Sequence, residues 1–234
     1  AFMVIGVPVW LAGKASTYNR FSVIDACQAL GHPALGEALK TAIAAAVSFH
    51  PTKVIAAGEG GAVLTNDKEI VDVVKELRDY GRDAVTRRQT KLGVNHRMDE
   101  MSAALAISQL LRLHDNIARR KELVALYDKA LADVEGITVV PHPEDSTAYL
   151  YQVRVSDQEG FRKKLLDRGI ETQIHHPPIH LEPYYRQRFG YGEGDFPNAE
   201  AFGKSVVTLP LYSSMSKEDL VRVVEAIKET FVTA

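Results

Sequence analysis

The sequence predicts an α/β protein in which a large domain with a mainly parallel sheet is followed by a smaller α/β domain. In the first half, short apolar runs with Gly or Pro at their edges alternate with helical patterns. After Gly136 the runs become shorter, and a Pro- and aromatic-rich stretch interrupts them. We therefore expect one domain over residues 1–135 and a second over residues 136–234.

The first domain is expected to contain four strands, over residues 4–10, 21–26, 44–49 and 61–65. Continuous apolar runs of this kind are typical of strands covered on both faces. A helix is expected over residues 66–80, ended by Gly81. Asp99 is a candidate N-cap for a long helical pattern that stops before Gly136. If unbroken, this helix would extend about 50 Å and would link the two domains.

The second domain is expected to be built from three short strands and two helices. The strands are predicted over residues 137–140, 149–155 and 170–174, and the helices over residues 157–168 and 217–231. Residues 175–197 form the Pro- and aromatic-rich interruption.

Charge and composition exclude several classes of protein. The formal net charge of -2 argues against nucleic-acid binding, which needs a basic field. The local cluster of Arg82, Arg87, Arg88 and Lys91 is interpreted as a solvated loop, with a contact to a diphosphate-bearing substrate as the alternative. No apolar stretch reaches the ~18 residues of a membrane span, and Cys27, the single cysteine, cannot form an intrachain disulfide. We expect a cytoplasmic protein in which Cys27 is a packing residue.

Three polar side chains follow candidate strands. Lys53 ends the run S-F-H-P-T-K, which begins at Ser48, and Asp25 ends the preceding strand. Ligands of open α/β sheets bind beyond the carboxyl ends of the strands. An acid, a hydroxyl and an amine match the needs of pyridoxal 5'-phosphate (PLP), whose pyridinium nitrogen, phosphate and aldehyde they would serve. The alternatives are a capping role for Asp25, an ordinary buried hydroxyl for Ser48 and a surface position for Lys53.

Five ordered blocks of the chain resemble one family. They are I-D-A-C-Q-A-L-G (24–31), S-F-H-P-T-K (48–53), G-E-G-G-A-V-L-T-N-D (58–67), L-G-V-N-H-R-M-D-E (92–100) and I-H-H-P-P-I-H-L-E-P-Y-Y (174–185). In these blocks the chain is similar to the DegT/DnrJ/EryC1/StrS family of PLP-dependent sugar aminotransferases. The resemblance implies the fold type I of PLP-dependent transferases.

The resemblance also implies roles for individual residues. Lys53 would be the Schiff-base lysine and Asp25 the partner of the pyridinium nitrogen. Gln28 would lie near the ring hydroxyl and Ser48 on the phosphate. Asn95 would reach the phosphate of the neighbouring subunit's cofactor, which implies a homodimer.

Cys27 and the histidines need a separate interpretation. Residues two apart on a strand share a face, so Cys27 is expected beside the cofactor ring on the side of Asp25. The histidines at 175, 176 and 180 lack the partners and spacing of a metal site, and we expect no metal. The family counterpart of this loop lines the substrate pocket, which makes His176 the candidate substrate residue. For His50, support of the site and plain packing both remain open.

These observations favour a sugar aminotransferase. By resemblance, the amino donor is an amino acid, glutamate or glutamine, and the acceptor is a keto-sugar linked to a nucleotide. A related chemistry of the family, sugar dehydration, replaces the lysine with histidine, and Lys53 speaks against it. The alternative is a truncated or degenerate relative that binds a sugar or a partner without turnover.

That alternative depends on the N-terminal part of the chain. Family members carry a Gly/Ser/Thr phosphate loop and a ring-stacking aromatic residue upstream, and neither precedes Asp25. Residues 11–20 are also barely long enough for the crossover of ~10 to 12 residues that parallel strands need. We therefore expect residues to be missing before Ala1 and near residues 11–20.

Overall fold

The computed structural model describes residues 23–231. The strand expected over residues 4–10, the connection over residues 11–20 and the start of the next strand lie outside the described residues. By its internal contacts the chain divides into two compact units. Unit 1 contains the residues up to Ala118 together with His142–Tyr149, and unit 2 contains Arg119–Pro141 and the residues from Leu150 onward.

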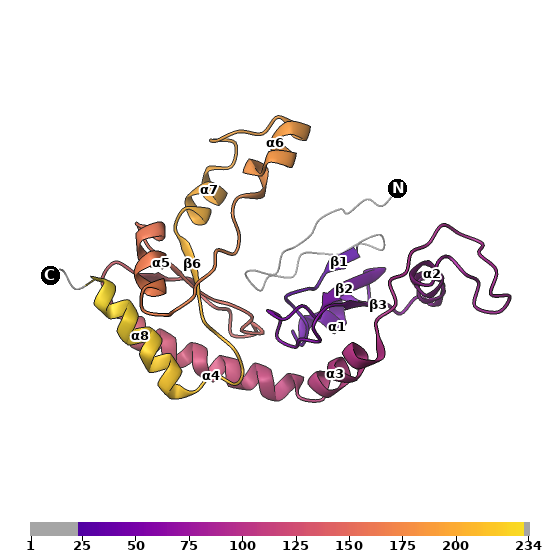
Figure 1. The fold of residues 1–234 in the computed structure, drawn as a ribbon, viewed down its shortest axis with the longest axis horizontal. Coiled ribbons are helices and arrows are strands. Elements are labelled where there is room, and N and C mark those ends of the chain that lie inside the picture. Colours follow the sequence, from indigo (N-terminus) through magenta and orange to yellow (C-terminus); the bar gives the residue numbers. More distant parts are fainter. Residues whose placement is uncertain (1–22, 232–234) are drawn as a thin grey trace. The chain divides into compact units, whose positions relative to one another are not determined.

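Unit 1 is built on a three-stranded sheet in the order β1 (Val23–Asp25), β2 (Ala44–Ser48) and β3 (Gly61–Leu64), drawn in indigo and violet in Figure 1. β1 and β2 are parallel, with Asp25 opposite Ala46, and the short helix α1 (Ala34–Ala38) lies between them in the chain. β3 runs antiparallel to β2. The carboxyl ends of β1 and β2 therefore lie at the same edge of the sheet.

The helix expected over residues 66–80 is confirmed as α2 (Lys68–Arg78). The Asp67 carboxylate accepts a hydrogen bond of 2.8 Å from the backbone N–H of Glu69, so it caps one of the free donors of the first turn. Gly81 follows the helix with a φ of 71°, a conformation that glycine adopts without steric cost.

The prediction of one unbroken helix after Asp99 is wrong. Asp99 does cap a helix through the N–H of Ser102, at 2.9 Å. However, the helical pattern is divided into α3 (Glu100–Leu110) and α4 (Leu113–Leu131). At the break, the N–H of Arg112 bonds to Gln109, three residues back, so the backbone tightens and the α-helical bonding is interrupted.

Unit 2 contains an antiparallel sheet in the order β4 (Thr138–Val139), β5 (Tyr151–Arg154) and β6 (Val206–Leu209). The strands expected over residues 137–140 and 149–155 are confirmed in shortened form. The strand expected over residues 170–174 is wrong, because only an isolated bridge between Gln173 and Thr208 forms there. The strand that pairs with β5 is β6, which is fully buried and was not expected from the sequence.

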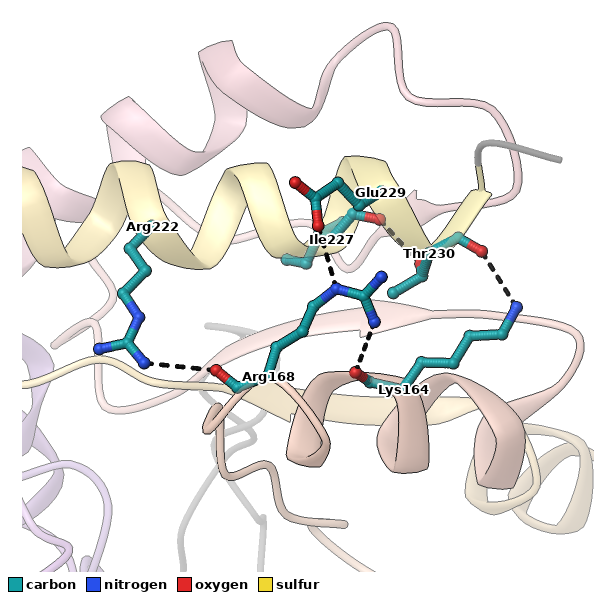
Figure 2. Close-up of polar contacts among 6 residues, drawn as sticks. All are labelled: Lys164, Arg168, Arg222, Ile227, Glu229 and Thr230. Carbon is teal, nitrogen blue, oxygen red and sulfur yellow. Dashed lines mark hydrogen bonds and ion pairs between the residues drawn. The ribbon is translucent and has the colours of Figure 1, made fainter. Parts of the chain in front are cut away.

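The two helices expected in this unit are confirmed as α5 (Gln158–Leu166) and α8 (Lys217–Phe231). Figure 2 shows the polar contacts of α8 with α5 and with the turn that follows α5. Arg168 pairs with Glu229 at 3.1 Å, the Lys164 ammonium donates to the Thr230 carbonyl at 3.1 Å, and Arg222 donates to the Arg168 carbonyl at 3.3 Å. Because the Arg168–Glu229 pair is exposed, it contributes little, and burial of Leu165 and Ile227 is the main stabilising term.

The Pro- and aromatic-rich stretch contains η1 (Ile179–Leu181) and α6 (Pro183–Phe189) and leads into α7 (Pro197–Gly203). The buried side chains of His180 and Glu200 connect η1 to α7. The Glu200 carboxylate lies 3.0 Å from His180 and accepts a hydrogen bond of 2.8 Å from the backbone N–H of Gly194. Burial raises the pKa of Glu200, but the hydrogen bonds from His180, Gly194 and Phe196 outweigh burial and hold that pKa below its usual range. None of the helices within residues 23–231 is long and apolar enough to cross a membrane.

Candidate active site

The candidate site lies at the edge of the sheet where β1 and β2 end. Asp25 is the last residue of β1 and Ser48 the last residue of β2. After β2 the chain makes a turn in which the Ser48 hydroxyl accepts the N–H of His50 at 3.3 Å. The N–H of Lys53 then bonds to the His50 carbonyl at 2.9 Å. The parallel pairing and this turn place an acid, a hydroxyl and an amine at one edge.

Cys27 joins the end of β1 to β2 at this edge. The Asp25 carboxylate accepts the N–H of Cys27 at 3.0 Å, and the Cys27 sulfur lies 3.8 Å from the Ala46 carbonyl of β2. Burial, followed by the hydrogen bond and the negative charge of Asp25, raises the pKa of the Cys27 thiol to about 11, while the charge of Lys53 acts in the opposite direction. With its pKa raised, the Cys27 side chain stays a neutral thiol near pH 7.

The Lys53 amine is half-buried and contacts Tyr149, a residue that the sequence reading missed. Its Nζ donates to the Tyr149 hydroxyl at 3.2 Å and lies 4.6 Å from the centre of the Tyr149 ring. The same hydroxyl lies 3.4 Å from the Thr52 hydroxyl, which lies 2.9 Å from Nδ1 of His50. His50 therefore belongs to a hydrogen-bonded chain that leads to Lys53.

Tyr149 reaches Lys53 because residues 142–149 belong to unit 1. The Thr147 hydroxyl donates to the main-chain carbonyl of Gln28 at 3.0 Å, which places Gln28 beside this segment. The imidazole of His32, which is buried, lies 3.3 Å from the Asp145 carboxylate. Tyr149 and Lys53 are 96 residues apart, and a contact over that separation has no local sequence signal.

Asn95 lies on a different part of unit 1, in the loop formed by residues 80–98. This loop returns to the end of α2, where Asn95 forms an isolated antiparallel bridge with Asp79. Asp79 pairs with Arg97 and, at 3.1 Å, with Arg87. The hydrogen bond from Arg97 outweighs the opposing effect of burial and holds the pKa of Asp79 below its usual range. Of the basic cluster in this loop, Arg87 and Lys91 are thus both ion-paired, Arg87 with Asp79 and Lys91 with Glu76, although both lie at the surface.

His176 lies in unit 2. It is exposed, and its ring meets that of His175 edge-on at a centroid distance of 4.9 Å. The Nδ1 of His175 lies 3.0 Å from the Thr208 hydroxyl on β6. Within residues 23–231, no group of three or more His, Cys, Asp or Glu side chains is arranged to hold a metal ion.

The residues at the sheet edge fit PLP by the chemistry of their groups. Asp25 is a carboxylate suited to a pyridinium nitrogen, Ser48 a hydroxyl suited to a phosphate, and Lys53 an amine suited to an aldehyde. Cys27 lies between Asp25 and β2 as a small neutral group that a flat ring could contact. The ends of β1 and β2 thus supply the kinds of group that this cofactor requires.

The α/β fold of the described residues is similar to that of the fold type I of PLP-dependent transferases. The sequence profile of the DegT/DnrJ/EryC1/StrS aminotransferase family matches residues 11–228, and the chain belongs to this family.

Individual relatives agree with this assignment. The chain is 37% identical over 220 residues to a dTDP-3-amino-3,4,6-trideoxy-alpha-D-glucose transaminase of Streptomyces venezuelae, covering 92% of this chain and 58% of that protein. It is 30% identical to a UDP-4-amino-4,6-dideoxy-N-acetyl-beta-L-altrosamine transaminase of Campylobacter jejuni, covering 89% and 58%.

Solved structures are similar as well. S. venezuelae DesV matches with a TM-score of 0.78 and 34% identity, over 91% of this chain and 58% of that one. The PLP form of the putative sugar aminotransferase Spr1654 from Streptococcus pneumoniae matches with a TM-score of 0.80 and 25% identity, over 89% and 57%. The chain therefore spans less than two thirds of the length of these relatives.

Proposed function

We propose that the whole protein is a PLP-dependent aminotransferase that moves an amino group from an amino acid, glutamate or glutamine, to a keto-sugar linked to a nucleotide. The observation that carries this proposal is the half-buried Lys53 amine in the turn after β2, at the sheet edge where the Asp25 carboxylate ends β1 and the Ser48 hydroxyl ends β2. Support for the substrate class comes from the relatives, two of which are named as dTDP-sugar and UDP-sugar transaminases.

Each residue of the edge has a defined task in this proposal. Asp25 would keep the pyridinium nitrogen protonated, because a carboxylate stabilises a neighbouring positive charge. The Ser48 hydroxyl would donate to the phosphate, Gln28 would serve the ring hydroxyl, and Cys27 would contact the ring. When bound, PLP supplies an electron sink that stabilises negative charge at the substrate carbon.

Lys53 has two tasks. Its Nζ would hold the cofactor through the aldehyde carbon, with loss of the aldehyde oxygen as water. As a free amine, the same nitrogen would be the general base that accepts the proton from the substrate carbon and later gives it up. Partial burial of Lys53 limits the access of water to this nitrogen.

We also propose that the functional unit is a homodimer in which Asn95 reaches the cofactor phosphate of the other subunit. Asn95 is exposed, and apolar side chains near it in sequence are exposed as well, among them Leu92 (93%) and Met101 (83%). Covering such side chains with a second copy would be favourable. Mixing Lys53→Ala with Asn95→Ala subunits should restore activity, since one site of the heterodimer then carries neither substitution. If subunits exchange and no activity returns, Asn95 acts within its own chain.

The remaining assignments are proposals of the same kind. His176 would contact the sugar substrate, the protein would be cytoplasmic, and residues 1–135 and 136–234 would belong to the large and the small domain of the whole protein. An isothermal titration with the nucleotide sugar should give a weaker Kd for His176→Ala than for the unchanged protein.

The proposed function is tested by the location of bound PLP. The protein is incubated with PLP, reduced with borohydride and digested, and the peptides are mapped by mass spectrometry. The pyridoxyl adduct should lie on the peptide containing Lys53 and should be absent in Lys53→Arg, which retains a positive charge. An adduct on another lysine would overturn the assignment of Lys53. The absence of any adduct, together with retained sugar binding, would favour a non-catalytic relative.

A further inference from the structure

The amine of Lys53 is held by one residue of unit 1, Tyr149. Its nitrogen lies against one aromatic residue in two ways, by donating to the Tyr149 hydroxyl at 3.2 Å and by lying 4.6 Å from the Tyr149 ring centre. Tyr149 is buried, with 8% of its surface exposed. A buried ring is a fixed reference point, whereas a lysine side chain has four rotatable bonds and loses considerable entropy when it is ordered.

The position of Tyr149 is itself determined by its neighbours. Two residues earlier, the Thr147 hydroxyl is bonded to the main-chain carbonyl of Gln28, and Asp145 lies against the buried His32. Both partners belong to the stretch that follows β1 directly. Tyr149 is therefore tied to the strand that ends in Asp25, and it holds an amine that follows the neighbouring strand β2.

The hydroxyl of Tyr149 has a second neighbour, Thr52. The two hydroxyl oxygens lie 3.4 Å apart, and the Thr52 hydroxyl lies 2.9 Å from Nδ1 of His50. Thr52 and His50 are exposed, so the chain of groups begins in solvent and ends at Nζ of Lys53. The Thr52 contact also limits rotation of the Tyr149 hydroxyl and so helps to direct it toward the amine.

We infer that Tyr149 is a positioning residue for Lys53. It holds the free amine at the sheet edge whenever that amine is not bonded to cofactor, and Thr52 orients the Tyr149 hydroxyl for this task. This inference rests on the proposed function for its catalytic meaning. The hold on the amine itself is a property of the chain, and it can be measured without turnover.

Two reactions of the Lys53 amine, acetylation and capture of PLP, distinguish a positioning role of Tyr149 from a role in packing alone. An acceptor that holds Nζ shields the nitrogen from a small reagent that approaches from solvent, but it presents the nitrogen correctly to a cofactor bound at the edge. Tyr149→Phe keeps the ring and removes the hydroxyl. Acetylation of Lys53 by acetic anhydride should then become faster, while capture of PLP should become slower. General loosening of the site would move both rates in the same direction.

The experiment uses the purified full chain after removal of PLP. Acetylation of Lys53 is measured by peptide mass mapping relative to Lys40, an exposed lysine in the same unit. Capture of PLP is followed by its absorbance. For Tyr149→Phe we expect acetylation to rise and capture to fall, each by about threefold to tenfold, as for the loss of one hydrogen bond of ordinary strength. The matched control is Tyr151→Phe, which removes a hydroxyl bonded to Asp128.

Thr52 provides a second, independent pair of variants. Thr52→Val should shift both rates in the same directions as Tyr149→Phe but by less, and Thr52→Ser, which keeps the hydroxyl, should restore them. Unchanged rates in Tyr149→Phe, or parallel changes in both rates, would overturn the inference. If acetylation rises as expected but the unchanged protein captures no PLP, the proposed function fails and the hold of Tyr149 on Lys53 stands.

Discussion

Replacing Gly93 with alanine should destabilise the loop that carries Asn95. A Cβ at this position would collide with the backbone of the facing strand of the loop, lying 2.6 Å from the carbonyl carbon of Tyr80 and 2.7 Å from Cα of Gly81, with the Gly81 nitrogen closer still. These are backbone atoms, so no side chain can rotate away. Overpacking of this kind costs about 1–3 kcal/mol. It exceeds the roughly 0.4–1 kcal/mol that Gly→Ala contributes by restricting the unfolded chain.

Gly36 supplies the matched control in the same unit. It lies in α1, and a Cβ there would meet no atom within 4 Å. Gly36→Ala should therefore stabilise the protein by up to about 1 kcal/mol, as expected for glycine replaced by alanine inside a helix. The two substitutions are chemically identical, and the structure predicts opposite signs.

The assay combines urea unfolding with hydrogen exchange. The loop is closed by backbone bonds from Tyr80 to Val94 at 3.0 Å and from Val94 to Leu77 at 2.8 Å. In Gly93→Ala, peptides covering residues 80–98 should exchange faster than in the unchanged protein, and in Gly36→Ala they should not. If Gly93→Ala leaves both the unfolding midpoint and the exchange of these peptides unchanged, the close approach of the two loop segments is refuted.

Three further predictions follow from other parts of the chain. Asp25→Asn should retain its circular dichroism spectrum and lose transamination by about a hundredfold or more, and near-normal turnover would mean that Asp25 is only a cap. Because the folded pKa of Glu200 is lowered, its stabilising effect is complete above its ordinary value of 4.5 and is lost as the pH falls through the lower folded pKa. Acid unfolding in this window should therefore be less steep in Glu200→Gln. Leu165→Ala, at a fully buried position, should cost about 2–5 kcal/mol by urea unfolding, whereas the exposed Leu166→Ala should stay within about 0.5 kcal/mol.

Local signals predicted the parts of the fold that depend on neighbouring residues. Asp67 and Asp99 are both N-caps in the structure, because a carboxylate before a helical pattern needs only the next three residues to find its partner. The position of Asp25 and Ser48 at one edge also follows from sequence, since the carboxyl ends of parallel strands meet at the same edge of a sheet.

The errors concern contacts between distant residues. The sequence predicts a strand over residues 170–174, but only Gln173 pairs there, through an isolated bridge to Thr208 of β6, which lies more than thirty residues later in the chain. Tyr149 is predicted to begin a strand, because aromatic residues in apolar runs are typical of strands. Its contact with Lys53 forms because the chain returns to unit 1 at residues 142–149. No sequence pattern near position 149 predicts that return.

The chain crosses between its two units three times, after Ala118, after Pro141 and after Tyr149. A single proteolytic cut at any crossing would leave the units covalently joined, and neither unit can be expressed as one uninterrupted fragment. The third crossing follows directly on a residue of the candidate site. Tyr149, whose hydroxyl accepts a hydrogen bond from the amine of Lys53, is the last residue of unit 1 before this crossing, and Tyr151, two residues later in the chain, opens β5 of unit 2.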